Sequence, residues 1–305
     1  MSVSDFFKPK ANPRSPRVKI AEQTLEAIEK GSYTLNGNTH PLNIETLERS
    51  TRYYAPDSML SNWRQKPKDS PTKDTTISII EMTTLEGARY LSQNMTSQPQ
   101  SSPAPSRNTI GVLNFASAKK PGGGFLTGAQ AQEESIARSS TLYPSLMTNI
   151  AQTFYSHHLK DKKNFYYTHA MIYSSNVVVF RDDDGNWVEP LSIDVLTSAA
   201  VNAGEVRKNA EADPEEKIEK EMKERMARVL YLFEMRGTKN LVLGSFGTGV
   251  FQNKVPLIAS IWAELLSTRY QHSFDHVAFA IIGRKTFEEF RDTFNSHHSS
   301  QTVQS

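Results

Sequence analysis

Two adjacent glutamates and two glycine-rich runs are the residues of this chain whose types and spacing predict chemistry. Seven residues separate the triple glycine Gly122–Gly124 from Gln132, Glu133 and Glu134, which open a predicted helix. A carboxyl group can act as a general acid or base, and glycines let backbone N–H groups approach phosphate oxygens closely. Neither signal is specific alone. Triple glycines occur in floppy surface loops, and two acids at a helix start can simply complement the helix dipole.

The second glycine-rich run follows a predicted strand at 240–243 and precedes a predicted helix at 256–267. A glycine-rich turn between a strand and a helix suits a diphosphate, because N–H donors converge there and the helix dipole favours negative charge. The run has neither the Gly-Lys-Ser/Thr of a P-loop nor the glycine spacing of the dinucleotide fingerprint. An ordinary tight turn remains the alternative. The candidate binding residues of this second glycine-rich run are Gly244, Ser245, Phe246, Gly247, Thr248, Gly249, Val250 and Phe251.

The two glutamates are expected to play different parts. Neighbours on a helix do not face the same way, so at most one of Glu133 and Glu134 points at a reacting centre while the other supports it.

Composition excludes several classes of site. The chain has 305 residues, a net charge of +2 and no cysteine, so disulfides, thiolate nucleophiles and Cys-ligated metals are ruled out. So small a net charge is not that of a strong nucleic-acid binder. No apolar run is long enough to span a bilayer, and the N-terminus lacks a signal-peptide pattern, so we expect an intracellular protein without membrane contact.

Strand and helix patterns alternate along the chain, which predicts an α/β fold with a mainly parallel sheet. Ligands in such folds lie outside the carboxyl ends of the strands, where both glycine runs fall. Residues 32–73 are expected to form a winding segment, and 205–228 the solvated face of a helix. The expected strands are 76–82, 110–115, 176–180, 192–197, 240–243 and 276–282, and the expected helices are 16–31, 84–91, 132–142, 146–157, 214–235, 256–267 and 286–297.

The ends of the chain are polar. We expect a disordered basic tail at 1–16, one catalytic domain at 17–293 and a second disordered tail at 294–305. Within the domain, 17–107 is an extension with the first strand and 108–293 is the ligand-binding core. Residues 95–107 read as a Pro/Ser-rich loop. The histidines show no metal-ligand spacing, and the pairs at 157–158 and 297–298 are expected at the surface.

A family resemblance joins these signals. The run VLNFASAKKPGGGFLTGAQAQEES (112–135) closely resembles the signature of poly(ADP-ribose) glycohydrolases, and the compact microbial-type branch of bacteria and filamentous fungi is the nearer match. The run GSFGTGVFQN (244–253) is similar to the diphosphate loop of macrodomains, and SIDVLTSAAVNAG (192–204) also looks like a family segment. The resemblance extends in pieces from about residue 17 to about residue 290.

The resemblance implies a three-layer α/β/α macrodomain-like fold, with a mixed, mostly parallel sheet, an N-terminal helical extension and no metal or other cofactor. It assigns the catalytic acid/base to Glu134 and the positioning of the ribose at the cleaved bond to Glu133 and Gln132. Asn114 matches a position near that ribose. Gly122, Gly123 and Gly124 and the run from Gly244 to Phe251 would embrace the diphosphate.

Two phenylalanines have different candidate roles, and two other residues depart from the pattern of the family. Phe251 is the candidate for packing against a ribose, whereas a core position for Phe246 is at least as well supported. Ser117 stands where many macrodomains have asparagine, but a serine there is ordinary in the microbial branch. Val201 stands where proline looks commoner, which could alter the turn near Asn202.

The implied activity is hydrolysis of ribose–ribose O-glycosidic bonds in protein-bound poly(ADP-ribose), with ADP-ribose released from chain ends, in the nucleus or cytoplasm and in the DNA-damage response. The sequence leaves open a non-catalytic ADP-ribose-binding module and a hydrolase of mono-ADP-ribosylated protein or nucleic acid. Residues 3–9, with Val3, Phe6 and Phe7, resemble part of a motif that docks on the sliding clamp of replication, although its leading glutamine is missing.

Overall fold

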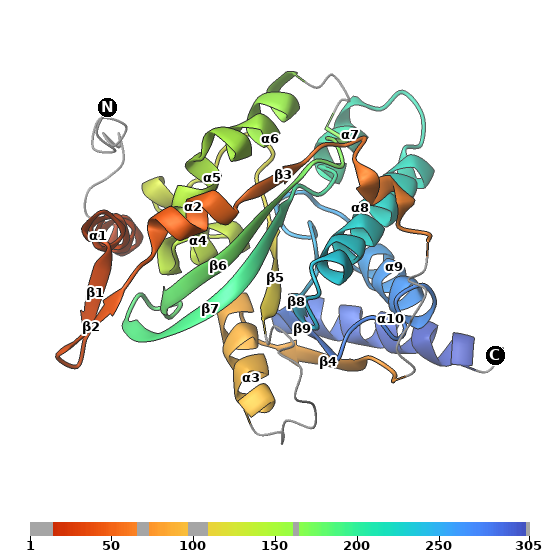
Figure 1. The fold of residues 1–305 in the computed structure, drawn as a ribbon. Helices are drawn as coiled ribbons and strands as arrows, with labels where there is room; N and C mark the ends of the chain where they lie inside the picture. Colours follow the sequence, from red (N-terminus) through yellow and green to blue (C-terminus); the bar gives the residue numbers. More distant parts are fainter. Residues whose placement is uncertain (1–14, 66–72, 97–108, 161–164, 303–305) are drawn as a thin grey trace.

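A mixed seven-stranded sheet forms the centre of the molecule (Figure 1). The structure is a computed structural model that describes residues 15–65, 73–96, 109–160 and 165–302. The strands lie in the order β3-β6-β7-β5-β8-β9-β4, in which β3–β6 and β6–β7 are antiparallel and the remaining neighbours are parallel. The bounds are β3 Arg52–Tyr54, β4 Thr76–Glu81, β5 Ile110–Phe115, β6 Met171–Arg181, β7 Trp187–Ser198, β8 Asn240–Leu243 and β9 His276–Ile281.

Helices cover both faces of this sheet and give three layers. On one face, buried side chains of α8, α9 and α10 join the core, and on the other those of α3, α4, α5 and α6 do so (Figure 1). The α/β/α architecture expected from the sequence is confirmed. The bounds are α3 Thr84–Thr96, α4 Gln132–Ser139, α5 Leu142–Met147, α6 Asn149–Lys160, α7 Ala203–Asn209, α8 Glu215–Met235, α9 Val255–Ser267 and α10 Arg284–Thr302.

The parallel strands β7, β5 and β8 place three loops at one edge of the sheet. Leu113 is level with Leu196 of β7, and Val112 is level with Val242 of β8. Chains that run in the same direction in register must leave the sheet on the same side. The triple-glycine loop after β5, the segment after β7 and the second glycine loop after β8 therefore meet there.

Residues 32–62 of the N-terminal extension form regular elements, so the expectation of a winding, partly ordered segment at 32–73 was wrong for this part. α1 (Pro16–Lys30) ends at Gly31, whose φ is 71°, and a hairpin of β1 (Ser32–Leu35) and β2 (Asn38–Pro41) follows. Asn36 and Gly37, with φ of 50° and 82°, form its turn, and Asn-Gly is a strong signal for such a turn. The chain then forms α2 (Ile44–Ser50), β3 at the edge of the main sheet and a 3-10 turn, Met59–Asn62.

Most other element predictions are confirmed, but several bounds differ from those expected. β6 and β7 are longer than expected and form one long antiparallel hairpin. The helix expected at 132–142 ends at Ser139, α5 is a separate helix, and α7 was not predicted. α10 continues to Thr302 and buries Phe294, so the tail expected from residue 294 begins inside a helix.

Two predictions of exposure were wrong because tertiary contacts override local pattern. On α8, Arg225 and Arg228 are 0% and 7% exposed, although the segment was expected to face solvent. His158 is buried too, with its two ring nitrogens 2.9 Å from Phe154 O and 2.9 Å from Thr168 Oγ1. His157 is exposed, as expected.

Some predictions lie outside the described residues. They are the tail at 1–14 with its clamp-like motif, most of the loop at 95–107 and the side chain of His298. In the described part of the chain, no helix combines the length and the apolar character needed to cross a bilayer.

Gly111 of β5 is a position where the core admits no side chain. A Cβ there would lie 2.5 Å from Phe233 Cε1 and 2.9 Å from Leu241 Cδ2. We expect Gly111→Ala to lower the free energy of unfolding by about 1–3 kcal/mol through overpacking, measured by urea denaturation. Gly249→Ala is the control, because a Cβ at Gly249 meets nothing within 4 Å. Equal stabilities of the two variants would contradict the packing described for β5.

Candidate functional site

The Glu133 carboxyl group is buried beneath the end of β5. The residue is 2% exposed, Oε2 accepts a hydrogen bond from Ser117 N (2.7 Å), and Oε1 lies 3.4 Å from Asn114 Nδ2. Burial raises the pKa of this carboxyl group to about 8, and the negative charge of Glu134 adds to the increase. Hydrogen bonds from Ser117, Asn114 and Gly122 act in the opposite direction, so burial dominates.

The Glu134 carboxyl group points elsewhere, into the triple-glycine loop. Its Oε1 accepts a hydrogen bond from Gly124 N at 2.9 Å, and the residue is partly exposed. The two carboxyl groups thus take different partners, as expected for neighbours on a helix. Of the two, only Glu134 combines a hydrogen-bonded position in the loop with access to solvent.

Gln132 joins the start of α4 to β5. Its Oε1 accepts a hydrogen bond from Phe115 N (2.8 Å), and its Nε2 donates to Leu113 O (2.7 Å) and to Thr84 Oγ1 (3.2 Å). The family resemblance assigned Gln132 to the ribose. In the structure its amide group binds the backbone of β5 and fixes the position from which the two glutamates project, and its contact with the ribose stays a prediction.

Polar atoms without partners lie where β5 and β7 end. Asn114 is fully buried, and its Nδ2 donates to Thr197 Oγ1 at 3.2 Å. Within the described residues, neither Asn114 Oδ1 nor the buried hydroxyl of Ser198 has a hydrogen-bond partner. Buried polar atoms are normally hydrogen-bonded, so these two indicate that this edge of the sheet is built to receive a polar ligand.

The triple-glycine loop is a tight turn rather than a floppy one. Gly122 and Gly123 have φ of 65° and 60°, and Gly123 N donates to Lys120 O. A Cβ on Gly123 would lie 2.3 Å from Glu134 Oε1, and one on Gly122 would lie 2.9 Å from the Phe125 ring. Both positions therefore require glycine, because of backbone conformation and because of close contacts.

The second loop is equally constrained. Gly247 has φ of 76°, and a Cβ there would lie 2.4 Å from Ala200 Cβ. Thr248 N and Oγ1 both donate to Ser245 O (3.1 and 2.9 Å). Asn253 Nδ2 donates to Gly247 O (3.0 Å) and to Val201 O (2.8 Å), which ties the loop to the segment after β7.

The side chains of the second loop differ in their surroundings. Phe246 is fully buried against Phe115, with ring centroids 5.5 Å apart, so its side chain belongs to the core, which was the better-supported alternative at the sequence level. Val250 is 79% exposed. Phe251 is partly buried and lies against Tyr167, with ring centroids 5.9 Å apart.

Sequence reasoning missed Tyr167 and Ser198. Tyr167 precedes β6, and Ser198 is the last residue of β7. No motif marks Tyr167, which comes to the site only because β6 and β7 form an antiparallel hairpin. Ser198 follows Thr197 in a segment that resembles the family, and its place at the end of a predicted strand was the available signal.

The arrangement combines a partly exposed carboxyl group, a buried carboxyl group and two loops rich in backbone N–H groups at one sheet edge. Such a site can bind an anionic ligand and deliver a proton to it. Among the residues described, no group of three or more His, Cys, Asp or Glu side chains is placed to hold a metal ion.

Comparisons with known proteins agree with this chemistry. The family model described as "Microbial-type PARG, catalytic domain" matches residues 21–182. The crystal structure of poly(ADP-ribose) glycohydrolase from Thermomonospora curvata is similar with a TM-score of 0.81 and 35% identity, covering 93% of this chain and 100% of the other.

Two further solved structures carry ligands. The same enzyme bound to the inhibitor ADP-HPD gives a TM-score of 0.78 at 35% identity, covering 93% of this chain and 99% of the other. The Deinococcus radiodurans poly(ADP-ribose) glycohydrolase in complex with ADP-ribose gives 0.72 at 32% identity, covering 84% and 99%. No match was found among curated proteins.

The pKa of Glu133 predicts how stability depends on pH. Since its pKa is about 8 in the folded protein, above its ordinary 4.5, folding favours the neutral acid. This contribution is fully present below about pH 4.5 and is lost as pH rises to about 8. We expect Glu133→Gln to gain stability relative to the wild type across that window, on the order of 1 kcal/mol per pH unit. Urea denaturation at several pH values measures it.

Glu22→Gln, on the exposed face of α1, is the control and should run parallel to the wild type. If Glu133→Gln also gives a parallel curve, the carboxyl group is not held neutral by burial.

Proposed function

This chain belongs to the family of microbial-type poly(ADP-ribose) glycohydrolases, and we propose that it hydrolyses ribose–ribose O-glycosidic bonds of poly(ADP-ribose) to release ADP-ribose, with Glu134 as general acid/base. The observation that carries this proposal is the position of Glu134, partly exposed and hydrogen-bonded to Gly124 N inside the triple-glycine loop. The relatives of known structure are glycohydrolases of this polymer, and one of those structures holds ADP-ribose.

Glycoside hydrolysis passes through a transition state that resembles an oxocarbenium ion. The leaving oxygen needs a proton, and the attacking water must lose one. Glu134 supplies the first proton as an acid and then accepts the second as a base. The Gly124 N–H group keeps the carboxyl group oriented toward the loop that carries the substrate.

Glu133 and Asn114 hold the ribose at the cleaved bond. The Glu133 carboxyl group is fixed by Ser117 N, and Asn114 keeps Oδ1 available in a buried position. A ribose presents hydroxyl groups that can donate to such oxygens. Gln132 supports both side chains indirectly, through its hydrogen bonds to Phe115 N and Leu113 O.

The two glycine loops bind the diphosphate. Their positive-φ glycines and close contacts allow the backbone to approach an anion without an intervening side chain. Negative charge on the bound diphosphate then stabilises the positive charge that develops on the ribose. Phe251, beside Tyr167, offers an aromatic surface for a ribose.

We propose that cleavage proceeds from chain ends, without a metal ion, inside the cell, and that the activity serves the DNA-damage response. A weak sliding-clamp contact through Val3, Phe6 and Phe7 is part of this proposal; these residues lie outside those that the structure describes.

Glu134→Ala and Glu134→Gln are expected to abolish turnover, because Glu134 is the acid of the proposed mechanism and its neighbour Glu133 is buried. Both variants should still bind ADP-ribose within about tenfold of the wild type, or about 1.4 kcal/mol. Automodified poly(ADP-ribosyl)ated protein is incubated with each enzyme, and the released products are separated by chromatography. Binding is measured by calorimetry.

Substantial turnover by Glu134→Ala would remove Glu134 as the acid. If the wild type binds ADP-ribose tightly but releases nothing, the protein is an ADP-ribose-binding module or acts on another ADP-ribosylated substrate. Accumulation of oligomers before ADP-ribose would contradict cleavage from chain ends.

Gly123→Ala is expected to lower kcat/KM at least about a hundredfold, or about 2.7 kcal/mol, because the new Cβ would displace the Glu134 carboxyl group. Gly123→Leu should also remove ADP-ribose binding. Gly31→Ala is the control, since Gly31 has a similar positive φ but a Cβ there would meet nothing within 4 Å. Equal activity in Gly123→Ala and Gly31→Ala would contradict the proposed close approach.

A further inference from the structure

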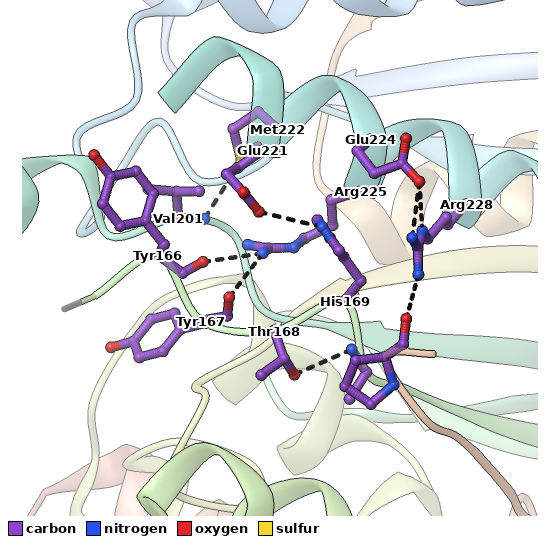
Figure 2. A network of polar contacts seen from close by, with 12 residues as sticks. Tyr166, Tyr167, Thr168, His169, Val201, Glu221, Met222, Glu224, Arg225 and Arg228 are labelled. Atoms are coloured by element: carbon purple, nitrogen blue, oxygen red, sulfur yellow. Dashed lines mark hydrogen bonds and ion pairs between the residues drawn. The ribbon is translucent and has the colours of Figure 1, made fainter. Parts of the chain in front are cut away.

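Arg225 is a buried guanidinium that connects two segments leading into the site. The residue is 0% exposed on α8. Its Nη1 donates to Ala199 O (2.9 Å), and its Nη2 donates to Tyr166 O (2.9 Å) and Tyr167 O (3.3 Å). Figure 2 shows the side chain reaching the carbonyl groups of the tyrosine pair from α8. One planar group thus binds the segment that precedes β6 and the segment that follows β7.

The segment before β6 has an unusual backbone. Phe165 and Tyr167 have φ of 70° and 55°, a region that bulky residues rarely adopt. Such backbone conformations persist only where neighbouring contacts stabilise them, and they are enriched at functional sites. The hydrogen bonds from Arg225 to Tyr166 O and Tyr167 O lie within this strained stretch.

These two segments contact the second glycine loop. The Tyr167 ring lies against Phe251, with ring centroids 5.9 Å apart. Asn202 N donates to Phe165 O (3.0 Å), which joins the two segments directly. Gly204 N, at the start of α7, donates to Phe251 O (3.1 Å).

A second connection runs from Arg225 to the glycine loop through the turn after β7. Arg225 binds Ala199 O, and two residues later Val201 O accepts from Asn253 Nδ2, which also donates to Gly247 O. The position of the loop backbone therefore depends on the same turn that the guanidinium holds.

We propose that Arg225 is a positioning residue for substrate binding: it holds Tyr167 against Phe251 and fixes the second glycine loop. Tyr167 is then a further ribose-facing side chain beside Phe251. The inference rests on the proposed function. A lysine cannot replace this arginine, because a single ammonium group does not offer a planar set of donors to carbonyl groups of two segments.

Arg228 is a matched control on the same helix. It is 7% exposed, and it donates to Glu224 Oε1 at 2.8 Å (Figure 2). It also donates to Pro56 O of the N-terminal extension. Both arginines are buried, and both bind a backbone carbonyl. Of the two, only Arg225 binds the segments that carry Tyr167 and Val201.

The test compares Arg225→Lys with Arg228→Lys in the full chain. Calorimetry gives Kd for ADP-ribose, steady-state assays give KM and kcat on poly(ADP-ribose), and thermal melting gives stability. For Arg225→Lys we expect Kd and KM to rise by about tenfold or more, with kcat within about threefold and an unchanged pH profile, because Glu134 lies on α4. For Arg228→Lys we expect Kd within about twofold, whatever its loss of stability.

The inference is overturned if the two variants weaken binding equally, if Arg225→Lys leaves Kd unchanged, or if it lowers kcat while KM stays constant. Should Arg225→Lys fail to fold, two variants of Tyr167 test the inference. Tyr167→Leu should raise Kd for ADP-ribose by about tenfold. Tyr167→Phe, which keeps the ring, should recover most of the affinity. Equal Kd values for Tyr167→Leu and the wild type overturn the inference.

The same measurements distinguish failure of the proposed function from failure of this inference. A wild type that neither binds ADP-ribose nor releases it overturns both the function and the inference. A wild type that does both, together with variants that bind as it does, overturns the inference alone.

Discussion

The hydrogen bond from Ser117 N to the buried Glu133 carboxyl group is the interaction on which the placement of Glu134 and of the triple-glycine loop depends. It fixes the first turn of α4 beneath the end of β5, and Gln132 reinforces that position through Phe115 N and Leu113 O. Once these two side chains are directed inward, the helix geometry turns Glu134 toward the glycine loop. The loop then has to approach the helix so closely that Gly123 cannot carry a Cβ.

The two glycine loops are held in place by different sets of contacts. The first is held by the side chains of α4 and by packing from the N-terminal extension, where Thr24 Oγ1 donates to Arg138 O at 2.6 Å and Val18 lies against Gly128. The second is held by its own turn and by Asn253, which reaches the segment after β7. Each loop therefore depends on a different part of the chain, and damage to one need not spread to the other.

The sequence predicted what depends on local pattern. The apolar runs of β5 and β8 and the glycine loops that follow them were located correctly, because strand periodicity and turn chemistry are encoded within a few residues. The sequence also separated Glu133 from Glu134 by helix geometry. It could not show that His158 and Arg225 are buried, or that Tyr167 faces Phe251, because those positions follow from contacts between distant segments. β3 was missed for a related reason: its three residues form a strand only because β6 offers an edge.

Two neighbouring carboxyl groups with opposite surroundings give a physical basis for dividing the catalytic work. Both oxygens of Glu133 face protein donors, and the residue is 2% exposed, so its contact with solvent is small. Glu134 has one protein donor and contact with solvent, so it can exchange protons with a substrate and with water. Different surroundings for two carboxyl groups are a general route to distinct catalytic roles. The same sequence pair in a solvent-exposed helix would offer two equivalent acids and no such division.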